Sequence, residues 1–197
     1  AQQIKSVPKL GIMKSQLLSK TLILFTAMAL LLSSCKDEDV DPPRIDAQSS
    51  SSQVIIVNEG GFQKGNASLS IYDKVGQDIV HKAFENKNMQ PIGDVLQSVS
   101  EINGDLWLVV NNSGKIWVVD SSSFKIKHEI TGFSSPRYAL KVSDEKVFVS
   151  DLFGGVISVV DLTTFKIETT IPLTGWTEKM VLAGAKAWIT NRNNYFK

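Results

Sequence analysis

The chain has 197 residues with 21 basic and 20 acidic side chains, a formal charge of +1. Residues 1–34 hold four lysines and no acid, so their removal as a leader would leave 17 basic and 20 acidic side chains, a formal −3. A mildly acidic chain without a cluster of Lys or Arg lacks the positive surface that binds phosphate backbones, which argues against a nucleic-acid partner.

The N-terminal region has the pattern of an export signal. Residues 1–12 precede the first methionine and show no pattern, so we interpret them as a non-native upstream extension. Residues 13–34 carry Lys14 and Lys20 ahead of an apolar run at 21–32. This run fits a signal peptide and is too short to span a bilayer.

The end of this leader, Leu-Ser-Ser-Cys at 32–35, resembles the lipobox of bacterial lipoproteins, in which the cysteine is lipidated. Cys35 is the only cysteine, so its lipidation would leave none for a disulfide, a thiol nucleophile or a metal site. A buried core cysteine is the alternative. Residues 36–39, Lys-Asp-Glu-Asp, are similar to the tag that sends lipoproteins to the cell surface in one large group of Gram-negative bacteria; a solvated charge run is the alternative. Together they imply an outer-membrane protein, anchored through its N-terminal lipid and exposed at the surface.

Residues 35–53 form a predicted linker between the lipid and the folded domain. They are acidic, then contain prolines, then become rich in serine, which is a composition typical of a flexible tether.

Residues 54–197 contain an internal repeat of short strands. Four strand endings are alike, at 55–58, 108–111, 148–151 and 188–191, and the last three follow one another at equal intervals. Residues 116–130 and 157–171, offset by 41, share eight identities in fifteen positions. A repeat of this length, when it is built from short strands, predicts an all-β fold of propeller blades.

Each blade is expected to have four strands, which we name A to D from the inside outward. One complete set of strands is predicted at 95–102, 106–111, 116–120 and 125–130, and the next at 136–143, 147–151, 156–161 and 166–171. Strands B and C are apolar on consecutive residues, as expected when both faces are covered. A β-sandwich is the competing fold, but it does not require the repeat. The pattern begins at strand B and stops after strand B of a fourth blade, so we expect three to four blades of a seven-bladed ring.

The motifs carry a family resemblance. The strand endings at 148–151 and 188–191 resemble the Tyr-Val-Thr-Asn motif of YVTN-type β-propellers. Segments 57–60, 111–116 and 135–138 are similar to surface-lipoprotein propellers encoded near TonB-dependent transporters. Some members of that group bind corrinoids such as cobalamin and pass them to the transporter. The resemblance therefore implies a small-molecule ligand, with cobalamin favoured, and a TonB-dependent outer-membrane transporter as partner.

Ligand contacts are expected in the loops that join B to C and D to the next A, because this strand order places both sets at one end of the ring. Phe153 and Trp176 are the most informative members, since bulky rings are unusual at loop tips. The first B–C loop is enlarged, because the stretch at 58–73 is longer than the equivalent stretches at 111–120 and 151–161. The predicted ligand-binding residues are Asn58, Glu59, Phe62, Asn111, Asn112, Arg137, Tyr138, Asp151, Phe153, Trp176, Asn191 and Arg192. The alternative is that the rings pack between blades and each Asn or Asp caps its own turn.

Chemistry is not expected from these residues. Asp73, Asp120 and Asp161 recur at the C–D turns, where a carboxylate typically accepts backbone N–H groups, and Phe124 and Phe165 are expected in the core. His81 and His128 are the only histidines; neither has metal-ligand spacing, and His128 is expected to be solvated. We therefore predict a binding protein with no metal, cofactor or catalytic site. The alternatives are a protein-interaction or adhesion scaffold, and a propeller enzyme whose site lies in further blades.

Overall fold

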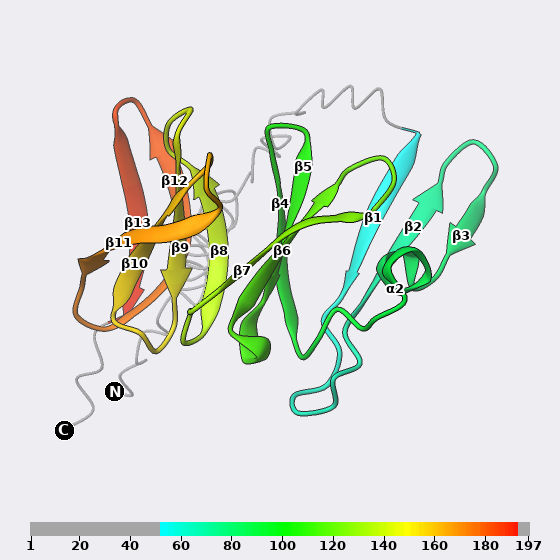
Figure 1. The fold of residues 1–197 in the computed structure, drawn as a ribbon, viewed down its shortest axis with the longest axis horizontal. Helices are drawn as coiled ribbons and strands as arrows, with labels where there is room; N and C mark the ends of the chain where they lie inside the picture. Colours follow the sequence, from blue (N-terminus) through cyan, green and yellow to red (C-terminus); the bar gives the residue numbers. More distant parts are fainter. Residues whose placement is uncertain (1–51, 193–197) are drawn as a thin grey trace, which may run out of the picture. The chain divides into compact units, whose positions relative to one another are not determined.

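The computed structural model describes residues 52–192, which form four antiparallel sheets in sequence order (Figure 1). In each sheet consecutive strands are neighbours, as predicted for blades. The first sheet is β1 (Gln53–Asn58), β2 (Ser68–Asp73) and β3 (Asp78–Val80). The second is β4 (Leu96–Ile102), β5 (Asp105–Val110), β6 (Lys115–Asp120) and β7 (Ile126–Thr131). The third is β8 (Pro136–Lys141), β9 (Lys146–Asp151), β10 (Val156–Asp161) and β11 (Lys166–Pro172), and the fourth is β12 (Trp176–Ala183) with β13 (Lys186–Arg192).

The predicted blades are confirmed, and so is the reason for their apolar runs. In β5, Leu106, Leu108 and Val110 face one hydrophobic core, whereas Trp107 and Val109 face a second. The first core lies between the first and second sheets and the second core between the second and third. A strand covered on both faces needs apolar side chains at successive positions, which is why β5 does not alternate.

The C–D turns are built as the sequence predicts. Oδ1 of Asp120 accepts the N–H groups of Ser122 and Ser123 at 3.2 and 2.8 Å, and Oδ1 of Asp161 accepts two equivalent N–H groups. The turn then closes with Phe124 and Phe165, whose φ values are +59° and +54°. Both rings pack into the cores between sheets, and this burial offsets the strain of a left-handed backbone in a bulky residue.

Two features differ from the sequence analysis. The segment between β3 and β4, expected as a plain D–A loop, contains the helix α2 (Ala83–Asn88), whose Ala83 and Phe84 are buried in the first core. The expectation of a solvated His128 is wrong, because its half-buried ring stacks on Phe165 with centroids 3.7 Å apart. A histidine on an outer strand is covered here by the C–D turn of the next sheet.

The predicted leader, the lipidated Cys35 and the linker to residue 51 lie outside the described residues. Among residues 52–192 no helix has both the length and the apolar character needed to cross a bilayer.

Candidate binding face at the loop end

The hairpin order of the sheets gathers two sets of connections, those after β1, β5 and β9 and those before β4, β8 and β12. We call this the loop end, and it includes the terminus of β13. The twelve predicted ligand-binding residues lie in these connections or at the adjoining strand termini. Their contacts divide them into groups with different roles.

The residues that end each strand B hold loops together. Asn111 is buried, and its Nδ2 donates to Ser135 Oγ at 2.8 Å and to the carbonyl oxygen of Pro136 at 3.0 Å in the third sheet. Asn58 donates to the hydroxyl groups of Ser68 and Ser70, which lie on the adjacent strand β2. Asn191 donates to the carbonyl oxygen of Thr174 at 2.8 Å. These amides therefore fix the loop end, and any direct contact with a ligand stays a prediction.

Asp151 is the most buried of the predicted polar residues, with 1% of its surface exposed. Its Oδ2 accepts the N–H groups of Ser134 and Ser135 at 2.9 Å, and its Oδ1 accepts those of Phe153 and Gly154 at 3.1 and 2.7 Å. A carboxylate that receives four N–H donors is satisfied without a ligand. Its structural effect is to fix the loop that carries Phe153.

Asp94, in the connection before β4, joins three segments of the loop end. Its carboxylate accepts the N–H of Gln63 at 2.7 Å and Nδ2 of Asn112 at 2.5 Å, and its own N–H donates to Ser113 Oγ. The hydrogen bond from Asn112 is the main cause of a lowered pKa for Asp94. The backbone oxygen of Glu59 also accepts the N–H of Leu96 at 3.1 Å. The enlarged first loop is thus held against the second sheet.

Phe153, Trp176 and Arg192 form an aromatic-cation cluster at the surface. The rings of Phe153 and Trp176 meet edge to face with centroids 5.8 Å apart, and Cζ of Arg192 lies 5.6 Å from the centre of the Trp176 ring. Phe153 is 64% exposed although it contacts Trp176. Phe62 in the first loop is 65% exposed and joins no ring cluster among the described residues. Phe153, Trp176 and Arg192 are all among the predicted ligand-binding residues, and the structure brings these three together.

Arg137 belongs to a row of polar side chains on the first strands of three successive sheets, β4, β8 and β12, which contact one another in that order. Its Nε donates to Glu178 Oε2 at 3.0 Å, and its Nη1 donates to Gln97 Oε1. Tyr138 is half-buried and donates its N–H to Ser150 Oγ. Gln97 and Glu178 were not predicted as partners, although their offsets of 40 and 41 from Arg137 follow the repeat. Arg137 is thereby held between two neighbours.

The described residues contain no group of three or more His, Cys, Asp or Glu side chains placed to hold a metal ion. What the loop end offers chemically is an exposed Phe153 ring against a half-buried Trp176 ring, beside a guanidinium group. Such a surface suits a flat or bulky ring system through stacking and cation–π contacts.

Comparisons with known proteins support the fold. A family model described as "Domain of unknown function (DUF5074)" matches residues 53–196. Among solved structures, a quinoprotein alcohol dehydrogenase-like protein of Bacteroides thetaiotaomicron is 12% identical with a TM-score of 0.53, and the match covers 72% of this chain and 34% of that one. A protein of Bacteroides fragilis provisionally named 6-phosphogluconolactonase is 10% identical with a TM-score of 0.52, and here 74% and 47% are covered. No protein with a curated description matches.

An extracellular domain provisionally assigned to a hybrid two-component system of B. thetaiotaomicron is 14% identical with a TM-score of 0.51, over 63% of this chain and 18% of that one. At these identities the likeness establishes a propeller-like fold alone. The chain spans less than half the length of each of these three structures.

Proposed function

The chain belongs to the DUF5074 family, and we propose that its loop end captures a bulky, ring-containing nutrient at the cell surface for transfer to an outer-membrane transporter. The aromatic-cation cluster of Phe153, Trp176 and Arg192 is the observation that carries this proposal. Covering an exposed ring of this size stabilises a complex by about 1.5–3 kcal/mol, and a stacked cation adds about 0.5–1 kcal/mol at an exposed site.

In the folded protein, hydrogen bonds and burial position two members of this cluster for binding. The backbone under Phe153 is fixed by the carboxylate of Asp151, and Trp176 is followed by Thr177, which is fully buried. A ligand that stacks on fixed rings loses less free energy to ordering of the protein than one that meets a mobile loop. The face is therefore pre-organised for binding, and we propose no chemical step.

A corrinoid is the ligand we favour, on the basis of the resemblance to propeller lipoproteins that capture cobalamin. The large ring of a corrinoid presents apolar surface and carries amide side chains. The rings of the cluster would contact the apolar surface, and polar groups at the rim, such as Asn112, would pair with the amides. Lipid anchoring at Cys35 and transfer to a TonB-dependent transporter form part of the same proposal and rest on the sequence motifs.

Titration calorimetry of the chain with cyanocobalamin tests this directly. We expect micromolar binding that Trp176→Ala weakens about tenfold, the effect of losing roughly 1.4 kcal/mol. Trp188→Ala is the matched control, because Trp188 is 60% exposed in the middle of β13 and takes no part in the cluster. Absence of binding at micromolar concentrations would exclude a corrinoid as the ligand. An equal loss of affinity in both variants would exclude the aromatic-cation cluster as the binding site.

A protein partner is the second candidate function, favoured by the exposure of Phe62 and Phe153 at the same end. Exposed aromatic residues are enriched in protein interfaces. A photo-reactive residue at position 153 would then crosslink to one envelope protein, and Trp176→Ala would abolish the product while cobalamin would not compete. Competition by cobalamin would instead support nutrient capture.

A further inference from the structure

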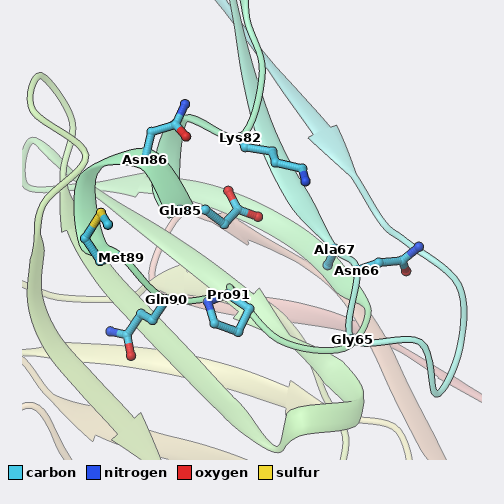
Figure 2. Close-up of a pocket in the computed structure, with 9 residues that line it drawn as sticks. All are labelled: Gly65, Asn66, Ala67, Lys82, Glu85, Asn86, Met89, Gln90 and Pro91. Atoms are coloured by element: carbon cyan, nitrogen blue, oxygen red, sulfur yellow. The ribbon is translucent and has the colours of Figure 1, made fainter.

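A concave region lies away from the aromatic-cation cluster, between α2 and the enlarged loop after β1. It is a cavity of about 560 Å³, within the size range of small-molecule sites, and shares no residue with the cluster (Figure 2). The residues that line it come from two insertions relative to the other sheets: the long β1–β2 loop and the segment that carries α2. Both departures from the repeat thus contribute to one pocket.

Glu85 of α2 is the central group of this pocket. Among the buried side-chain polar atoms of residues 52–192, Glu85 Oε2 alone has no hydrogen-bond partner. Burial is the main cause that raises the pKa of this carboxyl, and the nearby charge of Lys82 acts in the opposite direction. Buried polar atoms in folded proteins are nearly always paired. An orphaned oxygen in a concave site therefore points to a donor supplied from outside the chain.

Lys82 faces the same space but does not satisfy Glu85. No ion pair among the described residues joins the two side chains. In Figure 2 the Lys82 and Glu85 side chains extend into the space between α2 and the stretch of loop that holds Asn66. A ligand with a donor for the carboxylate and an acceptor for the ammonium group would bridge them.

Amide groups and apolar atoms complete the lining. Asn66 Oδ1 accepts the N–H of Gly61 at 2.8 Å, and Asn86 Nδ2 donates to the carbonyl oxygen of His81 at 3.0 Å. These bonds orient the Asn66 amino group as a donor and the Asn86 oxygen as an acceptor. Gln90 adds a third amide, and Met89 with Pro91 adds apolar surface. In Figure 2 the Asn86 and Gln90 amides lie at the rim of this space and point away from Glu85. Amide groups at the rim beside an apolar patch match a ring with hydroxyl groups on its edge and C–H groups on its face.

We propose that this pocket binds a polyhydroxylated, sugar-like small molecule, one of whose hydroxyl groups donates to Glu85 while a neighbouring hydroxyl oxygen accepts from Lys82. An α-amino acid also carries a donor and an acceptor for this charge pair. It would make no use of the three amides or of the Met89–Pro91 surface, so the sugar is the better match.

Ligand-observed saturation-transfer NMR with methyl α-D-glucopyranoside, methyl β-D-galactopyranoside and N-acetyl-D-glucosamine tests the proposal, with L-alanine as the competing probe. We expect at least one sugar to bind in the millimolar range or tighter. Glu85→Gln keeps the shape of the side chain and should weaken binding about tenfold, because it replaces the charged acceptor of this hydrogen bond with a neutral one and sets an NH2 group beside the ligand hydroxyl. Asn66→Ala, on the opposite wall, should also weaken it.

Two controls separate this site from other effects. Glu101→Gln alters an exposed carboxylate in β4, and Trp176→Ala alters the proposed nutrient face; sugar binding should be unchanged in both. Thermal melting of each variant shows that it is folded. Binding of L-alanine in preference to the sugars, binding of none of the three sugars, or sugar binding that Glu85→Gln leaves intact would each overturn the proposal. None of these results bears on cobalamin binding at the loop end.

Discussion

At the scale of single residues, carboxylates in this protein show opposite responses to their surroundings. Asp94, Asp120 and Asp161 accept hydrogen bonds from side chains or backbone N–H groups, which lowers the pKa of each below its ordinary value of 3.8. Glu85 has one oxygen without a partner, and burial raises the pKa of its carboxyl. The first three stabilise the fold when ionised, whereas Glu85 is better tolerated when protonated or bound to a donor.

The Asp120 turn should make the fold sensitive to acid. The pKa of Asp120 is far below 3.8 in the folded protein, so its contribution to stability is complete above 3.8 and is lost as pH falls through the folded-state pKa. We expect Asp120→Asn to melt at a lower temperature than the wild type at pH 7. The difference between the two should shrink steadily as pH is lowered from 4 to 2, about the range in which carboxylates protonate.

Melting curves followed by circular dichroism across this range provide the measurement. Asp78→Asn is the control, because Asp78 is an exposed carboxylate in β3 without equivalent turn hydrogen bonds. A difference between Asp120→Asn and wild type that stays constant from pH 7 to pH 2 would show that charge on Asp120 does not stabilise the turn.

At the scale of secondary-structure elements, the sequence predicted what recurs and missed what occurs once. The strands, the Asp turns, the buried Phe124 and the partly buried Phe165 were predictable because each appears in more than one copy at the same offset. The repeat also predicted that Phe153 and Trp176 lie at the loop end. The repeat did not predict the hydrogen bond from Asn111 to Ser135, which lies just before the third sheet. The equivalent asparagines have other partners: Asn58 bonds to the neighbouring strand, and Asn191 bonds to the connection that leads into its own sheet.

Helix α2 was not predicted, because it occurs in only one of the described connections and so gives no repeat signal. Its six residues are too few to show helical periodicity, and helices of this length are not stable by themselves. Tertiary contacts hold it: Phe84 packs on Trp117 with ring centroids 5.8 Å apart, and Trp117 Nε1 donates to the carbonyl oxygen of Ile92 just beyond the helix. The pocket around Glu85 was missed with it.

Asn88 is the polar anchor of α2. Its Nδ2 donates to the carbonyl oxygens of Phe84 and Phe124, both at 2.8 Å, and its Oδ1 accepts the N–H of Ile126 at 2.9 Å. Asn88→Ala leaves groups of the β6–β7 turn without partners, so we expect unfolding to become easier by about 1–3 kcal/mol. Urea denaturation measures this change.

Lys87→Ala is the control for this prediction, because Lys87 lies on the exposed side of the same helix. This substitution should change stability by less than about 0.5 kcal/mol. Similar losses of stability in both variants would show that helix propensity matters more than the hydrogen bonds of Asn88.

At the scale of the whole described region, the sheets are joined by different kinds of contact. The second sheet is bounded on both faces by hydrophobic cores, and β12 and β13 contribute no residue to either. The third and fourth sheets are linked instead by polar contacts near the loop end. Arg137 pairs with Glu178, and Thr177 Oγ1 exchanges hydrogen bonds of 3.0 and 2.9 Å with the backbone N–H and carbonyl oxygen of Asp151. The aromatic-cation cluster lies across this polar junction.

This difference predicts where the fold opens first. The fourth sheet meets the third through polar contacts, whereas β5 and β6 lie between two apolar cores, so local opening of β12–β13 requires less free energy than opening of β5–β6. We expect amide hydrogen exchange in β12–β13 to be at least about a hundredfold faster than in β5–β6, as followed by NMR. Thr177→Val removes the hydroxyl group at the polar junction and should speed exchange in β12–β13 while leaving β5–β6 unchanged. Equal acceleration in all four strands would instead mean that the sheets open as one cooperative unit.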